Sequence, residues 1–274
     1  EAIPEIEASD IKSIAKELGI DSNTENLVDY ETVRTAKWGL LAKGFDAFWE
    51  TEFVNTEFDA FCIEEAEWLV PYCKFRWLME ISGTEEWELW PEQYNTPGDA
   101  ETYLTTLPVE EVERNLTFFA WVQWHAFTQW RNLRDYAQQH DVKLMGDIPI
   151  GISYSSADVF FEPEWFDLTL SGGSPPETVF KDDAFACQWG QNWGIPIYRW
   201  DVLEQNDFSW WRRRIEKLTD IFHIFRIDHI LGFYRIYSFP WRPRRNEEFV
   251  GLSKKQARDI TGGPLPEFFP RSDD

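Results

Sequence analysis

Two short apolar segments, residues 142–150 and 221–228, constrain the fold of this chain most strongly. The first directly follows a long helical pattern, and the second follows another helical pattern at residues 208–218. Two strands joined by a long connection that contains a helix are typical of a parallel sheet. The sequence therefore predicts an α/β fold with a parallel sheet that includes both segments.

Residues 1–140 are predicted to form a helical subdomain, and residues 141–274 the part that contains the sheet. The broad apolar stripe at residues 109–140 indicates the clearest helix. Residues 86–107 contain prolines and a glycine and are expected to form a loop. The other expected helices lie at residues 9–19, 30–49 and 57–79, the last of them interrupted by Pro71.

Carboxylates stand at the ends of both predicted strands, at Asp147 and Asp228. In parallel sheets and barrels the chemistry lies at the carboxyl ends of the strands, so both are candidate site residues. Arg226 lies two residues before Asp228, and a strand places both on one face. A neighbouring cation lowers a carboxylate pKa by roughly 1 to 3 units, which suits a nucleophile. The same spacing also fits a structural ion pair, and Asp147 also fits a role in holding loop backbone.

The net charge of −23, from 49 acidic and 26 basic residues, argues against nucleic acid or an anionic membrane as a partner. Sixteen Trp, 22 Phe and 9 Tyr require a sizeable core. Aromatic rings combined with carboxylates suit a neutral, hydroxyl-rich ligand such as a sugar. Most of these rings are nevertheless expected to be core residues.

The cysteines and histidines indicate neither a disulfide framework nor a metal site. Cys62, Cys73 and Cys187 are an odd number without framework spacing, which favours a reducing, cytoplasmic compartment. The four histidines form no cluster with the cysteines, so no metal and no cofactor is expected. No stretch of about 18 apolar residues predicts a membrane span.

Five blocks of this sequence occur in the order in which their counterparts occur in one known family. The blocks are Gly-Asp-Ile-Pro-Ile at 146–150, Ser-Ala-Asp-Val at 156–159, Pro-Glu-Trp-Phe-Asp-Leu at 163–168, Trp-Gly-Ile-Pro-Ile-Tyr-Arg-Trp at 193–200 and Arg-Ile-Asp-His at 226–229, with Pro-Pro at 175–176. On these blocks the chain resembles, over essentially its whole length, the amylomaltases, which are 4-alpha-glucanotransferases (disproportionating enzymes) of glycoside hydrolase family 77. Residues 30–140 resemble the helical insertion of that family.

The resemblance implies a (β/α)8 TIM barrel that acts on alpha-1,4-glucans and maltooligosaccharides with retention, through a covalent glycosyl-enzyme intermediate. Asp228 matches the nucleophile of the family, and Arg226 matches the arginine that keeps it ionised. Ser155 stands where many members have Asp, so the substrate contact made there is expected to differ. The substrate-binding positions that the resemblance implies are His229, Asp147, Trp193, Ser155 and Asn192.

Parts of the family pattern are absent from this chain. The family has a general acid, a Glu in a Gly-Glu-Asp-Leu-Gly motif, and a second catalytic Asp. Neither motif has a match in this chain before Asp274. The first strands of the family's barrel, which would precede Glu1, also have no match. We therefore expect a central fragment that is inactive alone and needs the missing N- and C-terminal parts of its parent barrel. Two alternatives stay open, a hydrolase of the same mechanism and a non-catalytic glucan-binding module.

Overall fold

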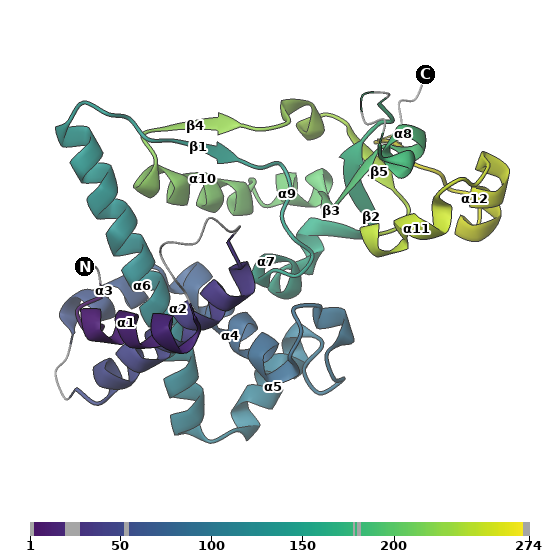
Figure 1. The fold of residues 1–274 in the computed structure, drawn as a ribbon. Coiled ribbons are helices and arrows are strands. Elements are labelled where there is room, and N and C mark those ends of the chain that lie inside the picture. Colours follow the sequence, from purple (N-terminus) through teal and green to yellow (C-terminus); the bar gives the residue numbers. More distant parts are fainter. Residues whose placement is uncertain (1–2, 20–27, 52–54, 178, 180–181, 271–274) are drawn as a thin grey trace.

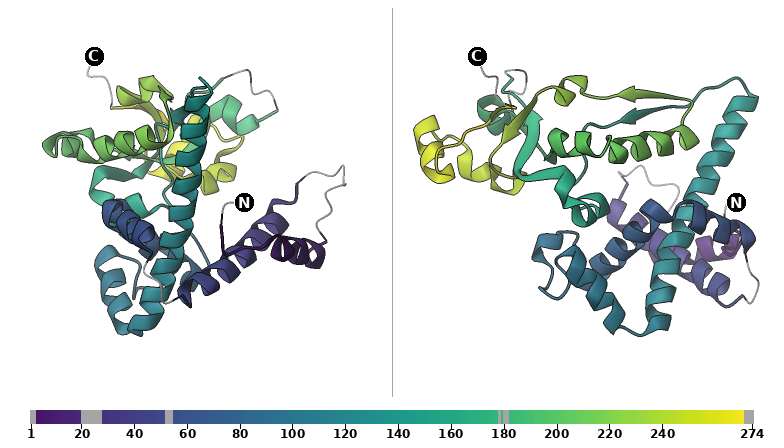
Figure 2. Two further views of the ribbon diagram at one scale, coloured as in Figure 1. Left: turned by 90° about the vertical axis from the view of Figure 1, so that its left-hand side faces the viewer. Right: turned by 180° about the vertical axis from the view of Figure 1, so that it is seen from behind.

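The structure is a computed structural model that describes residues 3–19, 28–51, 55–177, 179 and 182–270. A helical part and a sheet-containing part are joined by the long helix α6 (Figures 1 and 2). The helical part comprises α1 (Ala8–Glu17), α2 (Tyr30–Trp49), α3 (Thr56–Glu64), α4 (Ala66–Ser82), η1 (Trp87–Leu89), α5 (Pro97–Thr106) and α6 (Val109–Gln139). The strands are β1 (Met145–Ile148), β2 (Phe166–Ser174), β3 (Gln191–Tyr198), β4 (Ile224–Ile227), β5 (Ile236–Phe239) and β6 (Glu267–Phe269).

Short helices connect these strands, and the whole is an α/β fold. Among the described residues no helix is long and apolar enough to cross a membrane. The connecting helices are α7 (Ala157–Phe161), η2 (Pro163–Trp165), α8 (Ala184–Trp189), α9 (Trp200–Gln205), α10 (Ser209–Ile221), η3 (Ile230–Phe233), η4 (Pro243–Arg245), α11 (Asn246–Phe249) and α12 (Lys254–Thr261).

The helical part differs from the sequence prediction in two places. The helix predicted at residues 57–79 is two helices, α3 and α4, which meet at Glu65, while Pro71 lies inside α4 and removes one helix hydrogen bond. Part of the predicted loop is the helix α5. The Thr96 side chain accepts from the backbone N–H of Asp99, and Pro97 occupies the first helical position. Proline is favourable there, so the turn signal was a helix start.

The strands β1 and β4 form a two-stranded parallel sheet, which confirms that both predicted strands belong to a parallel sheet. Met145 pairs with Ile224 and Ile148 with Ile227, so both strands are shorter than the apolar segments that predicted them. The helix α10 covers one face (Figures 1 and 2). On the other face Met145, Asp147, Ile224 and Arg226 are exposed. The described residues thus form a parallel sheet of only two strands and no closed barrel. The second face of this sheet is exposed.

A second sheet, which the sequence did not predict, is antiparallel and has the strand order β3-β2-β5-β6. Its strands lack a clean alternation of apolar and polar residues, because β2 contains Gly172 and Gly173 and β3 contains Pro196. Gly173 is required by a close approach, since a Cβ there would lie 1.9 Å from the carbonyl oxygen of Gln191. This sheet lies beyond the carboxyl ends of β1 and β4 (Figure 1).

Ion pairs join the helical part to the sheets. The buried Glu65 carboxylate accepts hydrogen bonds from Arg131 of α6 at 3.2 Å and from Lys217 of α10 at 2.8 Å. Arg242, which precedes η4, makes a two-point contact with Glu88 of η1. Because α6 leads into β1 and α10 into β4, these contacts fix the two strands relative to the helical part.

His125 of α6 lies in an aromatic core and is 5% exposed. Its ring packs against Trp121 at 4.5 Å and Trp124 at 4.6 Å, and the nearest acid, Glu5, is 3.9 Å away. Burial lowers the pKa of His125 from 6.5 to about 4. Neutral His125 is therefore part of the folded core, whereas the unfolded chain binds a proton already near the ordinary His pKa.

We expect this histidine to reduce stability as pH falls from about 6.5 to about 4, because only the unfolded state gains the proton in that range. The loss amounts to about 3 kcal/mol of the free energy of unfolding. Urea unfolding at both ends of the range should show a smaller difference for His125→Phe than for the original chain. The matched control is His140→Phe, which changes an exposed histidine just after the same helix. Equal pH dependence in all three proteins would contradict this assignment.

Candidate functional site

The pairing of β1 with β4 brings Asp147, Arg226 and Asp228 together. Asp147 and Arg226 are register partners, and Asp228 follows the last residue of β4. The Arg226 guanidinium donates to Asp147 Oδ2 at 2.6 Å and lies 4.0 Å from Asp228 Oδ1. The Asp228 backbone N–H donates to the carbonyl of Ile148 at 3.0 Å, which fixes its position beyond the strand. Two carboxylates therefore share one guanidinium at the carboxyl end of the parallel sheet.

Arg226 is bound more closely to Asp147 than to Asp228, which the spacing within one strand did not predict. The hydrogen bond that Arg226 donates to Asp147, followed by the charge of that carboxylate, raises the pKa of Arg226 above its ordinary value. All three side chains remain about half exposed, at 48% for Asp147, 61% for Arg226 and 58% for Asp228. Asp147 thus orients the arginine, and the Asp228 carboxylate stays accessible to a ligand.

His229 directly follows Asp228 in the chain, and its ring contacts Trp193 of the antiparallel sheet. The His229 backbone is left-handed, with φ 50°, and its carbonyl accepts from Gly232 N–H at 2.8 Å. A Cβ at Gly232 would lie 2.8 Å from His229 Cδ2, so glycine leaves room for the imidazole. The His229 ring stands edge-on to the ring of Trp193, with 4.9 Å between the ring centroids, and Trp193 is 37% exposed. The residue after Asp228 is thus in contact with a partly exposed indole of β3.

Gln191 is a site residue that the sequence did not reveal. Its side-chain oxygen accepts from Trp193 Nε1 at 3.1 Å and from the Ser174 hydroxyl at 3.4 Å. This hydrogen bond orients the indole that packs on His229. No local motif marks Gln191, although its spacing of two from Trp193 places both side chains on one face of β3.

Asn192 is held by hydrogen bonds within the protein. Its oxygen accepts from the Ser171 hydroxyl at 2.6 Å, and its amide donates to the Trp241 carbonyl at 3.0 Å and to Asn246 at 3.1 Å. These bonds tie β3 to β2, to Trp241 and to the first residue of α11. Asn192 is thus held in place next to Trp193 at the start of β3.

Ser155 lies in the loop after β1 and is half-buried. Its backbone N–H donates to Ser153 Oγ at 3.0 Å, and no described hydrogen bond links it to Asp147, Arg226 or Asp228. The preceding residue, Tyr154, is buried, and burial raises its pKa to about 12. Tyr154 therefore anchors the loop that carries Ser155, while the structure does not join Ser155 to the carboxylates.

Known proteins are similar to this chain in sequence. The 4-alpha-glucanotransferase of Thermus thermophilus is 36% identical over 226 residues, which are 78% of this chain and 42% of that protein. The 4-alpha-glucanotransferase of Chlamydia pneumoniae is 32% identical over 213 residues, which are 77% of this chain and 38% of that protein. The matched region thus covers about two fifths of these curated relatives.

A solved structure has a similar fold. The amylomaltase from Streptococcus agalactiae, in complex with acarbose, superposes with a TM-score of 0.70 at 22% identity, covering 92% of this chain and 57% of that one. The sequence profile of glycoside hydrolase family 77, described as 4-alpha-glucanotransferase, matches residues 4–262. Because that match includes nearly the whole chain, this protein belongs to the 4-alpha-glucanotransferase family.

Proposed function

We propose that this chain is part of a 4-alpha-glucanotransferase that moves segments of alpha-1,4-glucans between maltooligosaccharides. The observation that carries the proposal is the accessible Asp228 carboxylate just beyond β4, with the Arg226 guanidinium at 4.0 Å. His229 directly follows Asp228, and the partly exposed ring of Trp193 that it contacts suits a sugar, whose C–H face packs on an indole. Family membership supports the same activity.

The proposed reaction has two steps, each an inversion at the anomeric carbon. In the first, the Asp228 carboxylate attacks that carbon and forms a glycosyl ester, while a general acid gives its proton to the departing glycosidic oxygen. In the second, the 4-hydroxyl of an acceptor glucan attacks the same carbon, its proton passes to the conjugate base of that acid, and Asp228 leaves as a carboxylate. Retention results, and only the acceptor distinguishes transfer from hydrolysis.

We assign the general acid to a part of the parent enzyme that this chain does not contain. A retaining mechanism places the acid about 5 to 5.5 Å from the nucleophile. Asp147 accepts a hydrogen bond from Arg226 and serves to orient that cation, so we give it no role as acid. Trp193 and His229 bind the donor sugar in this proposal, and Asn192 and Gln191 hold the part of β3 that carries Trp193.

We further propose that β1 and β4 are two strands of a (β/α)8 barrel that the rest of a longer parent protein completes. The exposed face of these strands supports this, because it carries the apolar Met145 and Ile224 next to the polar Asp147 and Arg226. In a barrel this face would point inward and place both polar residues at the mouth. Residues 1–140 would then be the helical insertion, and residues 141–274 part of the barrel with the antiparallel sheet at its mouth.

The products from maltotriose test the proposed activity. The intact parent enzyme should form glucose together with longer maltooligosaccharides, because a transferase passes the covalent intermediate to another sugar. Glucose and maltose without longer products would instead identify a hydrolase. Binding of maltotriose without any products would identify a glucan-binding module. Chromatography of the products against a control without protein distinguishes the three outcomes.

Replacing Trp193 by Ala in the intact enzyme should weaken maltooligosaccharide binding by about 1 to 3 kcal/mol, the scale of one large apolar contact. The melting temperature should change little, because the ring is already 37% exposed. The matched control is Trp130→Ala, which removes a 42% exposed indole from α6 and should leave glucan affinity unchanged. A large loss of melting temperature with unaltered affinity would show that Trp193 is a core residue.

A further inference from the structure

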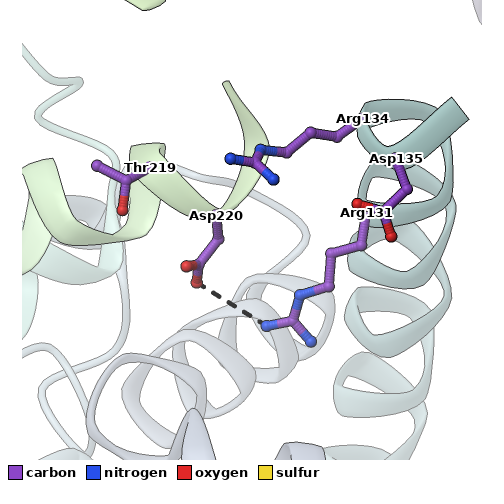
Figure 3. Close-up of a pocket in the computed structure, with 5 residues that line it drawn as sticks. All are labelled: Arg131, Arg134, Asp135, Thr219 and Asp220. Atoms are coloured by element: carbon purple, nitrogen blue, oxygen red, sulfur yellow. Dashed lines mark ion pairs between the residues drawn. The ribbon is translucent and has the colours of Figure 1, made fainter. Parts of the chain in front are cut away.

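A polar cleft of about 340 Å³ lies between α6 and the last turn of α10 (Figure 3). This volume is at the lower end of the roughly 300 to 1,000 Å³ that is usual for small-molecule sites. Because α10 leads into the start of β4, the cleft lies at the opposite end of the parallel strands from Asp228. The residues that line it are Arg131, Arg134, Asp135, Thr219 and Asp220.

Two of the cations around the cleft are already paired, and one is not. Arg131 donates to Glu65 at 3.2 Å, and Lys217 contacts Asp220 at 3.1 Å. Within the described part of the chain Arg134 makes no ion pair, and its Nε is buried without a hydrogen-bond partner. Figure 3 shows the Arg134 side chain extending from α6 toward α10. Because the Arg134 guanidinium lines the cleft without an acidic partner among the described residues, the cleft is suited to a ligand that brings an acceptor.

The acceptor that best fits Arg134 is a phosphate group. A guanidinium binds phosphate oxygens through parallel N–H donors. The guanidinium of Arg131, which is paired with Glu65 and lies 3.9 Å from Asp220, adds positive charge at the same cleft (Figure 3). The carboxylates of Asp135 and Asp220 would repel a bare anion but accept hydrogen bonds from hydroxyl groups. The lining therefore complements a molecule that carries both a phosphate and several hydroxyls.

We propose that this cleft binds a phosphate monoester of a polyol, such as a hexose phosphate. Its phosphate would lie against Arg134 and Arg131, and its hydroxyls would donate to Asp135 and Asp220. This site is separate from the glucan chemistry at Asp228, so binding here is expected whether or not that residue is a nucleophile. A bound ligand would stabilise the junction of α6 with α10, from which β4 begins.

Isothermal titration of the 274-residue chain with glucose 6-phosphate, inorganic phosphate and glucose tests the proposal. We expect saturable binding of glucose 6-phosphate that is about tenfold or more tighter than that of the other two ligands. Arg134→Ala should weaken it by about tenfold or more. The matched control is Arg212→Ala, which removes an equal charge from an exposed position on α10 and should have no effect.

Two further variants make the test independent of a folding failure. Arg134→Lys keeps the charge without the parallel donors, so its affinity should lie between those of the original chain and Arg134→Ala. Asp135→Ala should weaken the binding of glucose 6-phosphate, because it removes an acceptor for a hydroxyl. It should strengthen the binding of inorganic phosphate, because it also removes a repelling charge. Absence of saturation, equal affinity in the Arg134 variants, or inorganic phosphate binding as tightly as the ester would overturn the proposal.

Discussion

Replacing Asp228 by Asn in the intact enzyme is expected to reduce glucan transfer by a factor on the order of 10⁴ or more, the scale for removing a catalytic nucleophile. The amide has nearly the same shape as the carboxylate but cannot form the glycosyl ester. Binding of maltooligosaccharides should persist. Initial rates of transfer from maltotriose, compared with the affinity for the same sugar, measure the two effects separately.

The same variant distinguishes the nucleophile from a structural ion pair. Asp228 is 58% exposed and lies 4.0 Å from Arg226, so its replacement should change the melting temperature very little. Asp207→Asn is a matched control, because Asp207 is an exposed aspartate that pairs with Arg212 far from the cluster. Transfer within about tenfold of the original enzyme, or a loss of stability without loss of rate, would remove Asp228 from the proposed role.

The chain alone is expected to catalyse no transfer. Departure of the glycosidic oxygen needs a proton as Asp228 attacks, and general acid catalysis alone contributes about 10² to 10⁴ in rate. Asp147 accepts a hydrogen bond from Arg226 and is not assigned as that acid. The second face of β1 and β4 is open to water. Water would also compete with the acceptor sugar for any intermediate. Both the acid and the closed pocket are therefore expected from the rest of the parent enzyme.

Incubating the purified chain with maltotriose tests this prediction. The products should match those of a control without protein, even after long incubation at high protein concentration. Adding the missing segments of the parent enzyme as a separate polypeptide should restore transfer if the two parts assemble. Glucose and longer maltooligosaccharides from the chain alone would show that a carboxylate of this chain supplies the proton.

The parts of the fold that the sequence predicted are those with a strong local pattern. The stripe of α6 and the apolar segments at β1 and β4 each have the period of one kind of element. The helix α5 was missed because Pro97 and Gly98 indicate a turn when read alone, although Pro97 suits the first position of a helix. The α3 to α4 break lies at Glu65, whose carboxylate is held by cations from α6 and α10, so its cause is tertiary.

The antiparallel sheet was not predicted because its strands depend on contacts between distant segments. Gly173 weakens any strand signal, yet it is required where β2 approaches the carbonyl of Gln191. The site shows the same limit. The pairing of Arg226 with Asp147 spans 79 residues and follows from the register of β1 with β4, which no spacing within one strand reveals. Gln191 became visible only through the indole of Trp193 that it orients.

Trapping the covalent intermediate tests the central claim most directly. The intact enzyme would be mixed with maltotriose, stopped with acid during turnover, digested and analysed by mass spectrometry. We predict that the peptide containing Asp228 is heavier by one or more glucosyl residues, and that fragmentation places them on the Asp228 side chain. The Asp228→Asn enzyme should give the unmodified peptide alone. A glucosyl adduct on another carboxylate, or active enzyme without any adduct under conditions that preserve glycosyl esters, would contradict the proposed mechanism.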